Sequence, residues 1–153
     1  MTNLNSEEAR VVRRWAWRLG LGGLVPFVAL AIATWITGAD AGSRLVIAQL
    51  GYGAVILSFI GALHWGAALA APEVSARTTA IALVWSVLPS LVGWSALAIG
   101  PAWGLQLLAG TFVVALAVDW VLYRQYAFAS WFLGLRALLT AVAVVSLLAT
   151  RQY

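Results

Sequence analysis

Five long apolar stretches constrain this chain more than any other feature. A bilayer core about 30 Å thick needs roughly 20 apolar residues in a helix. Stretches of at least that order cover residues 19–37, 45–71, 78–99, 102–123 and 130–150. Only 9% of the 153 residues are charged, whereas a soluble domain has about 25%. We therefore predict an all-α integral membrane bundle of five transmembrane helices.

The amino-terminal segment differs from the rest of the chain by its charge. Arg10, Arg14 and Arg18 recur at helical spacing, with aromatic residues between them. This pattern is typical of a short basic interfacial helix lying on anionic head groups, or of the charged flank of the first membrane helix. We divide the chain into a basic interfacial segment, 1–18, and a five-helix transmembrane domain, 19–150.

The arginines also predict the orientation. If the amino terminus is cytoplasmic, the outer side holds only Arg44 and Arg151. The inner side then holds Arg10, Arg13, Arg14, Arg18, Arg77, Arg124 and Arg136. This excess obeys the positive-inside rule. All basic residues are Arg, a usage associated with GC-rich bacterial genomes. We expect a multi-pass protein of the bacterial inner membrane, with its amino terminus in the cytoplasm.

Three ionisable residues interrupt the apolar stretches: His64, Asp119 and Arg136. Such residues are costly in lipid, so they usually face the protein interior, pair with one another and mark a functional site. At about 1.5 Å of rise per residue, each lies roughly 7–10 Å from the inner end of its helix. We expect Asp119 to pair with Arg136, and Thr140, one turn further along, to add a hydroxyl.

The polar cluster has two interpretations at this point. In the functional one, His64, Asp119, Arg136 and Thr140 form a proton-binding site or a pocket for a polar ligand. In the structural one, Asp119 and Arg136 clamp two helices together, and His64 bonds to a neighbouring hydroxyl or carbonyl. Interhelical polar contacts in membranes contribute only about 0.6 kcal/mol on average, so a clamp would stabilise the bundle modestly.

Small residues mark two faces of the stretch 45–71. Gly53, Gly61 and Ala68 share a face with His64. A second stripe has members four residues apart, namely Ala54, Ser58, Ala62, Gly66 and Ala70. Small residues let helices approach closely. We expect this helix to be central, with Ala54, Ser58, Gly61, Ala62 and Gly66 at its packing surfaces.

A proline interrupts the stretch 78–99. Pro89 removes one backbone donor and frees the Trp85 carbonyl, and Ser86 and Ser90 flank the gap. We predict a helix kink at Ser86, Pro89 and Ser90. Such a kink either opens a cavity or is a packing feature whose free carbonyl is bonded by serine or water.

The sequence argues against catalysis. The chain has no Cys and a single His, which disfavours metal centres and bound haem. It has no Gly-rich phosphate loop, no His-Glu-x-x-His motif and no nucleophile elbow. Its net charge of +4 follows from membrane topology and does not indicate nucleic-acid binding. We predict no enzyme activity, no catalytic residue, no metal and no cofactor.

One segment is distinctive enough to carry a resemblance. It runs from Gly51 to Gly66 and reads GYGAVILSFIGALHWG. Weaker matches are Gly23–Phe27, Trp85–Pro89, Asp119 and Leu135–Thr140. Together they resemble the transmembrane protein 69-like family, a domain family of unknown function in proteobacteria and mitochondria. The resemblance covers nearly all of the chain after its amino-terminal arm. It implies a small multi-helix inner-membrane protein and assigns no catalytic residue.

Three functions fit these observations. The first is a non-enzymatic accessory subunit or assembly factor of a membrane complex, for example a respiratory complex. Such a protein would bind a membrane-protein partner or a second copy of itself. The second is a small transporter or proton- or ion-conducting protein that uses His64, Asp119 and Arg136. The third is a binder of lipid, quinone or pigment between helices. In each case the lipid bilayer is the surroundings and no nucleic acid is a partner.

Overall fold

The computed structural model describes residues 6–71, 73–126 and 129–153. Five helices follow one another along the chain: α1 (Ser6–Ile36), α2 (Ala39–Ala70), α3 (Ala76–Ile99), α4 (Pro101–Gln125) and α5 (Ser130–Ala149). Each contains a stretch long and apolar enough to span a membrane. The described residues contain no strand. The predicted all-α class with five membrane-spanning helices is confirmed.

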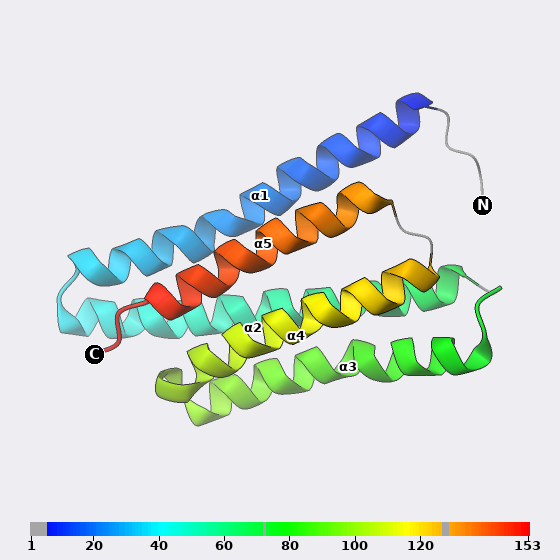
Figure 1. The fold of residues 1–153 in the computed structure, drawn as a ribbon. Helices are drawn as coiled ribbons and strands as arrows, with labels where there is room; N and C mark the ends of the chain where they lie inside the picture. The colour runs from blue at the N-terminus through cyan, green and yellow to red at the C-terminus, as the bar shows by residue number, and fades with distance from the viewer. Residues whose placement is uncertain (1–5, 72, 127–128) are drawn as a thin grey trace.

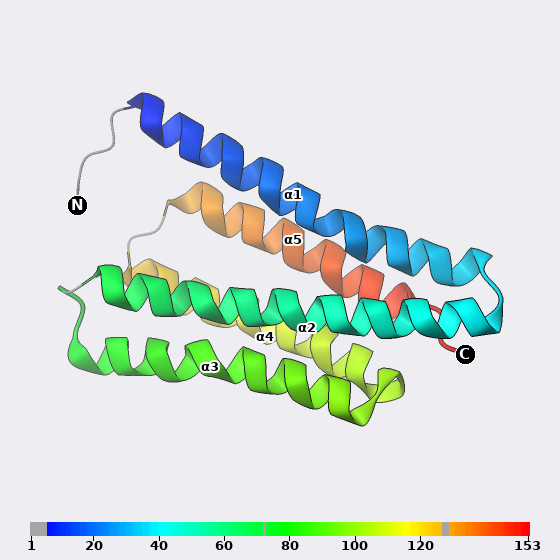
Figure 2. The ribbon, with the colours of Figure 1, turned by 180° about the vertical axis from the view of Figure 1, so that it is seen from behind.

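The helices run alternately up and down along one axis (Figure 1). α1 and α5 lie side by side on one side of the bundle, α3 lies on the opposite side, and α2 and α4 lie between them, as Figure 2 shows from behind. The carboxyl terminus lies at the end of the bundle where α1 meets α2, and the amino terminus lies at the other end. α2 packs against all four other helices, so its predicted central position is confirmed.

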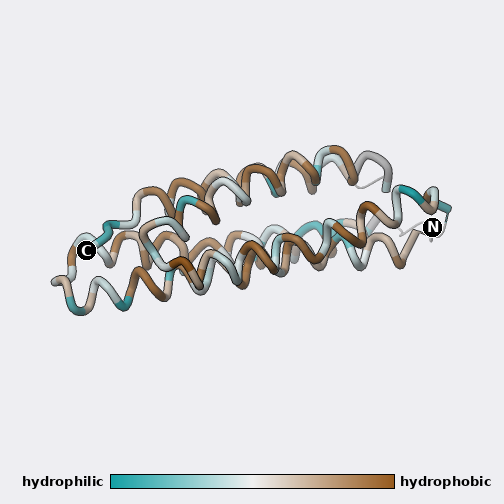
Figure 3. The backbone as a smooth tube through the Cα atoms, turned by 90° about the horizontal axis from the view of Figure 1, so that it is seen from below, coloured by the Kyte–Doolittle hydropathy of each residue, from teal (hydrophilic) through white to brown (hydrophobic). Residues whose placement is uncertain are grey.

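The outer surface of the bundle is apolar. Large exposed side chains include Trp94 on α3 and Trp103 on α4, which are 69% and 74% exposed. In Figure 3 hydrophobic residues fill the middle of the bundle, whereas hydrophilic residues gather towards its ends. Contiguous exposed apolar surface of this extent is unusual in soluble proteins and suits contact with lipid.

Two predicted helix starts differ from the structure. The expected boundary at residue 18 falls inside α1, so the described part of the basic segment 1–18 is the first part of that helix and not a separate element. Residues 1–5 lie outside the described residues. α2 begins at Ala39 and not at residue 45: Asp40 lies in its first turn, where a negative charge is favourable, and the Gly42 N–H already bonds to the Gly38 carbonyl.

The connection between α3 and α4 is the tightest in the bundle. Gly100 has φ 82°, a left-handed conformation that glycine adopts without steric cost. Pro101 follows as the first residue of α4, where its missing N–H would have no helical partner. This single-residue link keeps α3 and α4 adjacent and antiparallel.

The α2–α3 seam is closely packed around small residues. A Cβ atom at Gly61 would lie 2.4 Å from the Ser86 carbonyl oxygen and 3.3 Å from Cγ of Pro89. Likewise, a Cβ atom at Gly93 on α3 would lie 3.1 Å from the Ala54 carbonyl oxygen. Of the predicted packing residues of α2, Ala54 and Gly61 are therefore packed against α3.

Pro89 lies inside α3, and the helix is continuous from Ala76 to Ile99. A continuous helix can still bend at a proline, so the predicted kink at Ser86, Pro89 and Ser90 stays a prediction. Ser86 does not bond to the carbonyl that Pro89 frees; its hydroxyl donates to the Leu83 carbonyl at 2.6 Å. The proline ring instead packs over Gly61.

The carboxyl terminus fastens α5 to α1 at one end of the bundle. The Trp35 indole donates to the Ala149 carbonyl at 2.8 Å. The Tyr153 hydroxyl donates to the carbonyls of Thr34 and Thr37. Towards its amino-terminal end, α1 diverges from α2 (Figures 1 and 2). The fold is thus tied at one end and more open at the other.

Candidate functional site

Three ionisable side chains from three helices meet inside the bundle. His64 Nε2 on α2 donates to Asp119 Oδ1 on α4 at 2.8 Å. Arg136 Nε on α5 donates to Asp119 Oδ2 at 2.7 Å. His64 and Asp119 are fully buried, and Arg136 is 5% exposed. Each carboxylate oxygen of Asp119 therefore accepts one bond, and the three side chains lie at one level of the bundle.

The sequence predicted part of this geometry. The expected contact between Asp119 and Arg136 is present. His64 differs from the structural interpretation, because it bonds to the carboxylate of Asp119 and not to a hydroxyl or carbonyl. The reason is that α2 packs directly against α4, which brings the imidazole to the second oxygen of the same carboxylate. Conduction of protons or ions through the cluster stays a prediction, since a static geometry does not test a flux.

The cluster balances its own charge. The Asp119 carboxylate and the Arg136 guanidinium cancel, and with a neutral imidazole the three side chains carry no net charge. Removing either charged partner from such a buried pair would leave an uncompensated charge in a low-dielectric interior, which typically costs about 3–5 kcal/mol. The pair is therefore expected to hold Arg136 in a fixed position.

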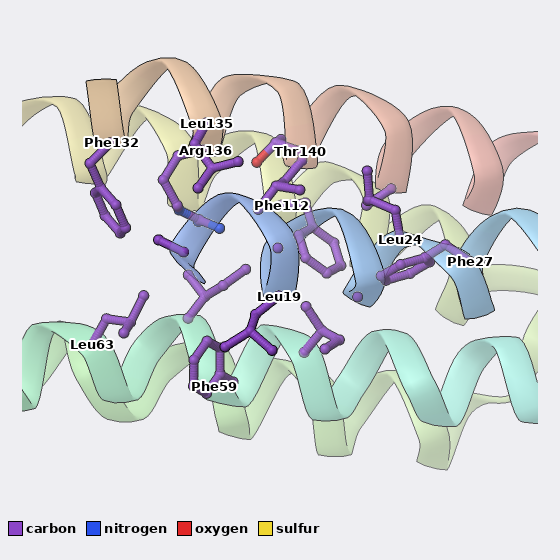
Figure 4. A pocket seen from close by; sticks show the side chains of 17 residues that line it. Leu19, Leu24, Phe27, Phe59, Leu63, Phe112, Phe132, Leu135, Arg136 and Thr140 are labelled. Carbon is purple, nitrogen blue, oxygen red and sulfur yellow. The ribbon is translucent and has the colours of Figure 1, made fainter. Parts of the chain in front are cut away.

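A cavity of about 340 Å³ lies beside this cluster. It is enclosed by α1, α2, α4 and α5, and its wall is almost wholly apolar (Figure 4). Four aromatic rings line it: Phe27, Phe59, Phe112 and Phe132. Pockets for small molecules in proteins typically measure roughly 300–1,000 Å³ and are mostly apolar with a few placed polar groups. This cavity falls at the lower end of that range.

The cavity has a closed end and an open side. Phe27 and Phe112 at the closed end are each only 1% exposed. Leu19 on α1 and Phe59 on α2 also line the cavity, yet they are 69% and 61% exposed. These two side chains mark an opening between α1 and α2 (Figure 4). In a bilayer that opening would face the lipid.

Two polar side chains of α5 lie in the cavity wall with atoms that lack a partner. Arg136 Nη2 and Thr140 Oγ1 are buried and have no hydrogen-bond partner among the described residues. Both residues line the cavity. Arg136 thus combines two features: its Nε bonds to Asp119, while its Nη2 is covered by neighbouring atoms and has no hydrogen-bond partner in the described structure. A buried donor without a partner costs about 1–3 kcal/mol, so such an atom calls for an explanation.

Thr140 contrasts with other hydroxyl residues in the helices. The hydroxyls of Thr111 and Thr150 bond to the carbonyl four residues earlier in their own chain, at 2.7 and 2.8 Å. This local bond is the usual solution for a helical threonine. Thr140 is 3% exposed and makes no such bond in the described structure. Its hydroxyl is therefore covered by neighbouring atoms without the local bond that the other two threonines make.

The predicted packing residues lie in two environments. Ala54 and Gly61 are buried against α3. Ser58 is half-buried, and Ala62 and Gly66 are exposed on the surface of α2. The stripe of small residues is therefore partly inside the bundle and partly on its outside.

Sequence analysis did not find the cavity. Its lining residues are ordinary Leu, Ile, Phe and Ala side chains spread over four helices. Nothing in their spacing separates them from residues that pack tightly or face lipid. The usable signal was indirect: Arg136 and Thr140 are one turn apart on one helix face, so a space beside one is a space beside the other. Among residues 6–71, 73–126 and 129–153, no three His, Cys, Asp or Glu side chains come together as a metal site.

Comparison with known proteins finds one family and several membrane-protein relatives. Residues 12–151 match the family described as "Protein of unknown function (DUF3429)". Transmembrane protein 69 of Xenopus tropicalis is 41% identical over 134 residues, which are 84% of this chain and 50% of that protein. Transmembrane protein 69 of Mus musculus is 31% identical over 131 residues, which are 85% of this chain and 52% of that protein. The chain spans about half the length of these relatives. No solved structure matches it.

Proposed function

The chain belongs to the DUF3429 family and is related to transmembrane protein 69. Because neither name states an activity, we propose a function from the geometry. The protein is a non-enzymatic membrane protein that binds one apolar small molecule in the cavity between α1, α2, α4 and α5. The family assignment confirms the resemblance drawn from the segment Gly51–Gly66, and a multi-pass membrane protein is the part of the predicted function that it supports.

One observation carries this proposal: the cavity is apolar but has two buried polar atoms without partners. A void that served only packing would have a wholly apolar wall or a wall whose polar groups were bonded locally. Arg136 Nη2 and Thr140 Oγ1 meet neither description. A molecule with an apolar body and a small polar group would fill the space and satisfy both atoms. The opening at Leu19 and Phe59 gives such a molecule a path from the bilayer.

Two adjacent glycines of α1 provide the test. Gly23 lines the cavity, and the nearest atom to a Cβ there would be the Tyr52 hydroxyl oxygen at 3.8 Å. Gly22 is exposed, and a Cβ there meets nothing within 4 Å. Gly23→Leu should fill the cavity, whereas Gly22→Leu changes the same helix by the same side chain on its outer face. Both substitutions raise helix propensity equally.

The measurement is mass spectrometry of small molecules that co-purify with the full chain from native membranes. We expect an apolar molecule with the wild type and with Gly22→Leu, and its loss from Gly23→Leu. Equal retention by Gly23→Leu and Gly22→Leu, with both variants folded, would contradict binding in this cavity.

A second candidate role is that of an accessory subunit or assembly factor. It is favoured by the exposed part of the small stripe on α2, at Ala62 and Gly66, since small residues allow another membrane helix to approach. The test is the mass of the intact particle that is purified from native membranes. A stable heteromer or homo-oligomer that Ala62→Leu dissociates supports the role. Ala80→Leu, at an exposed position of α3, is the matched control. A monomer in every case would contradict it.

We also propose the bacterial inner membrane as the location, with the amino terminus in the cytoplasm. The arginine distribution supports this orientation. The chain has no Cys, so single cysteines report sidedness cleanly. Gly38→Cys lies between α1 and α2, and Glu73→Cys lies between α2 and α3. A membrane-impermeant maleimide applied to intact cells should label Gly38→Cys and spare Glu73→Cys; the reverse pattern would overturn the orientation.

A further inference from the structure

If the cavity binds an apolar molecule, as proposed above, its wall further specifies what kind of polar group that molecule carries. We infer that the ligand is a neutral ring compound with a carbonyl oxygen, of the class of lipid-soluble quinones, and that this oxygen bonds to Arg136 Nη2 and Thr140 Oγ1.

The unpartnered atoms select a hydrogen-bond acceptor. A guanidinium nitrogen carries only donors, and a hydroxyl can donate as well as accept. The two atoms project from residues one helical turn apart on α5, so a single acceptor can lie between them. A ligand group that only donates would leave Arg136 Nη2 without a partner. A carbonyl oxygen, with two lone pairs, matches both donors.

Charge selects a neutral acceptor. The Arg136 guanidinium is already compensated by Asp119, to which its Nε donates at 2.7 Å. A ligand carboxylate or phosphate would therefore add an uncompensated negative charge beside a buried carboxylate, in a wall that is otherwise apolar. Burying an isolated charge in such surroundings is far more costly than burying a bonded neutral carbonyl.

The aromatic wall selects a ring over an acyl ester. Phe27, Phe59, Phe112 and Phe132 line a space of about 340 Å³. Flat rings that pack against aromatic side chains in offset or edge-to-face arrangements gain stabilisation beyond the burial of their area. Flexible acyl chains gain nothing comparable from this geometry. The space admits a ring and the beginning of a tail, and the opening beside Leu19 and Phe59 lets the remainder of the tail lie in the bilayer.

The test uses four synthetic probes with the same ten-carbon chain. They are decyl-1,4-benzoquinone, decylbenzene, methyl decanoate and decanoate. The full chain is purified in detergent, and binding is measured by native mass spectrometry. Thr140→Val removes the hydroxyl while keeping the shape and the Asp119–Arg136 pair. Thr140→Ser keeps the hydroxyl, and Thr111→Val makes the same change at a half-buried position outside the cavity, whose hydroxyl bonds within its own helix.

We expect decyl-1,4-benzoquinone to bind the wild type more tightly than the other three probes. Loss of one neutral hydrogen bond should make Thr140→Val bind it about fivefold more weakly. Thr140→Ser and Thr111→Val should bind it as the wild type does, and decylbenzene should bind wild type and Thr140→Val equally.

The other outcomes separate the two proposals. If decylbenzene binds as tightly as the quinone and Thr140→Val changes neither, carbonyl recognition is overturned while apolar binding stands. Tighter binding of methyl decanoate would overturn the ring, and tighter binding of decanoate would overturn neutrality. If none of the probes binds, or if Gly23→Leu binds all of them as the wild type does, both proposals fail.

Discussion

The α2–α3 seam and the cavity use the same helix in opposite ways. Along the seam α2 presents Gly61 and Ala54, and the backbone of α3 comes so close that a Cβ at Gly61 would lie 2.4 Å from the Ser86 oxygen. On another side α2 presents Phe59 and Leu63 to a space of about 340 Å³. The first contact leaves no room, and the second leaves room beside two polar atoms without partners.

This difference indicates where stability and binding reside. Lipid is as apolar as the helix surfaces, so close packing of small residues is the main force that holds membrane helices together. The seam supplies that force. The cavity forgoes packing contacts and leaves donors unsatisfied, which lowers stability. A fold that keeps both regions is consistent with binding at the loosely packed one, and substitutions can separate the two effects.

The largest effect on the free energy of unfolding is expected at Asp119, whose carboxylate holds Arg136 in the cavity wall. Asp119→Asn leaves the Arg136 guanidinium buried without its counter-charge, so the free energy of unfolding should fall by about 3–5 kcal/mol. Asp40→Asn, at an exposed position in the first turn of α2, is the matched control and should change little. Unfolding in mixed micelles followed by circular dichroism measures both. Equal stability of Asp119→Asn and wild type would mean that the buried pair does not anchor Arg136.

The next largest effect concerns the seam. Gly61→Ala forces a Cβ against the Ser86 backbone, which a side-chain movement cannot relieve, so unfolding should become easier by about 1–3 kcal/mol. Gly66→Ala meets nothing within 4 Å and should be neutral, or stabilising by up to about 1 kcal/mol through helix propensity. The same unfolding measurement applies. If Gly61→Ala were as stable as Gly66→Ala, the seam would be looser than its geometry indicates.

A smaller effect on stability is expected at two buried threonines, Thr140 inside α5 and Thr150 at its carboxyl end. Thr150 donates to the Ser146 carbonyl, whereas Thr140 has no partner in the described structure. Thr150→Val should therefore lower the free energy of unfolding by about 1 kcal/mol, while Thr140→Val should leave it unchanged or raise it. Thermal denaturation of the two ligand-free variants compares them. A loss at Thr140 equal to that at Thr150 would show that its hydroxyl already has a structural bond.

The smallest effect is expected at His64. Its bond to Asp119 Oδ1 is one interhelical polar contact, and such contacts in membranes contribute about 0.6 kcal/mol on average. His64→Gln should lower the free energy of unfolding by about that amount, and the Asp119–Arg136 pair should persist. If His64→Gln lowered the free energy of unfolding as much as Asp119→Asn does, His64 would be as important as Arg136 for stabilising the buried carboxylate, contrary to this prediction.

Much of the fold could be predicted because lipid imposes simple rules. Apolar length fixed the five spans, and the matching depths of Asp119 and Arg136 indicated their contact. The predicted start of α2 was wrong, since Asp40 is typical of a turn and equally of the first turn of a helix, where its charge is favourable. The partner of His64 depended on how three helices pack together, which no single stretch of sequence contains.

The cavity could not be predicted for a related reason. Whether Phe59 or Leu63 lines a space, packs or faces lipid depends on the angle between α1 and α2. That angle depends on how α1 packs against both α2 and α5. The sequence shows an apolar side chain in every case.

The most direct measurement is the infrared absorption of a ligand carbonyl in the cavity. Decyl-1,4-benzoquinone labelled with ¹³C at its carbonyls is bound to the full chain, and its carbonyl stretch is compared with that of the same molecule in micelles. We expect a band at lower frequency in the wild type, because bonds to Arg136 and Thr140 weaken the C=O bond, and a smaller displacement in Thr140→Val. A bound quinone whose carbonyl band is unchanged from the micelle value would contradict it.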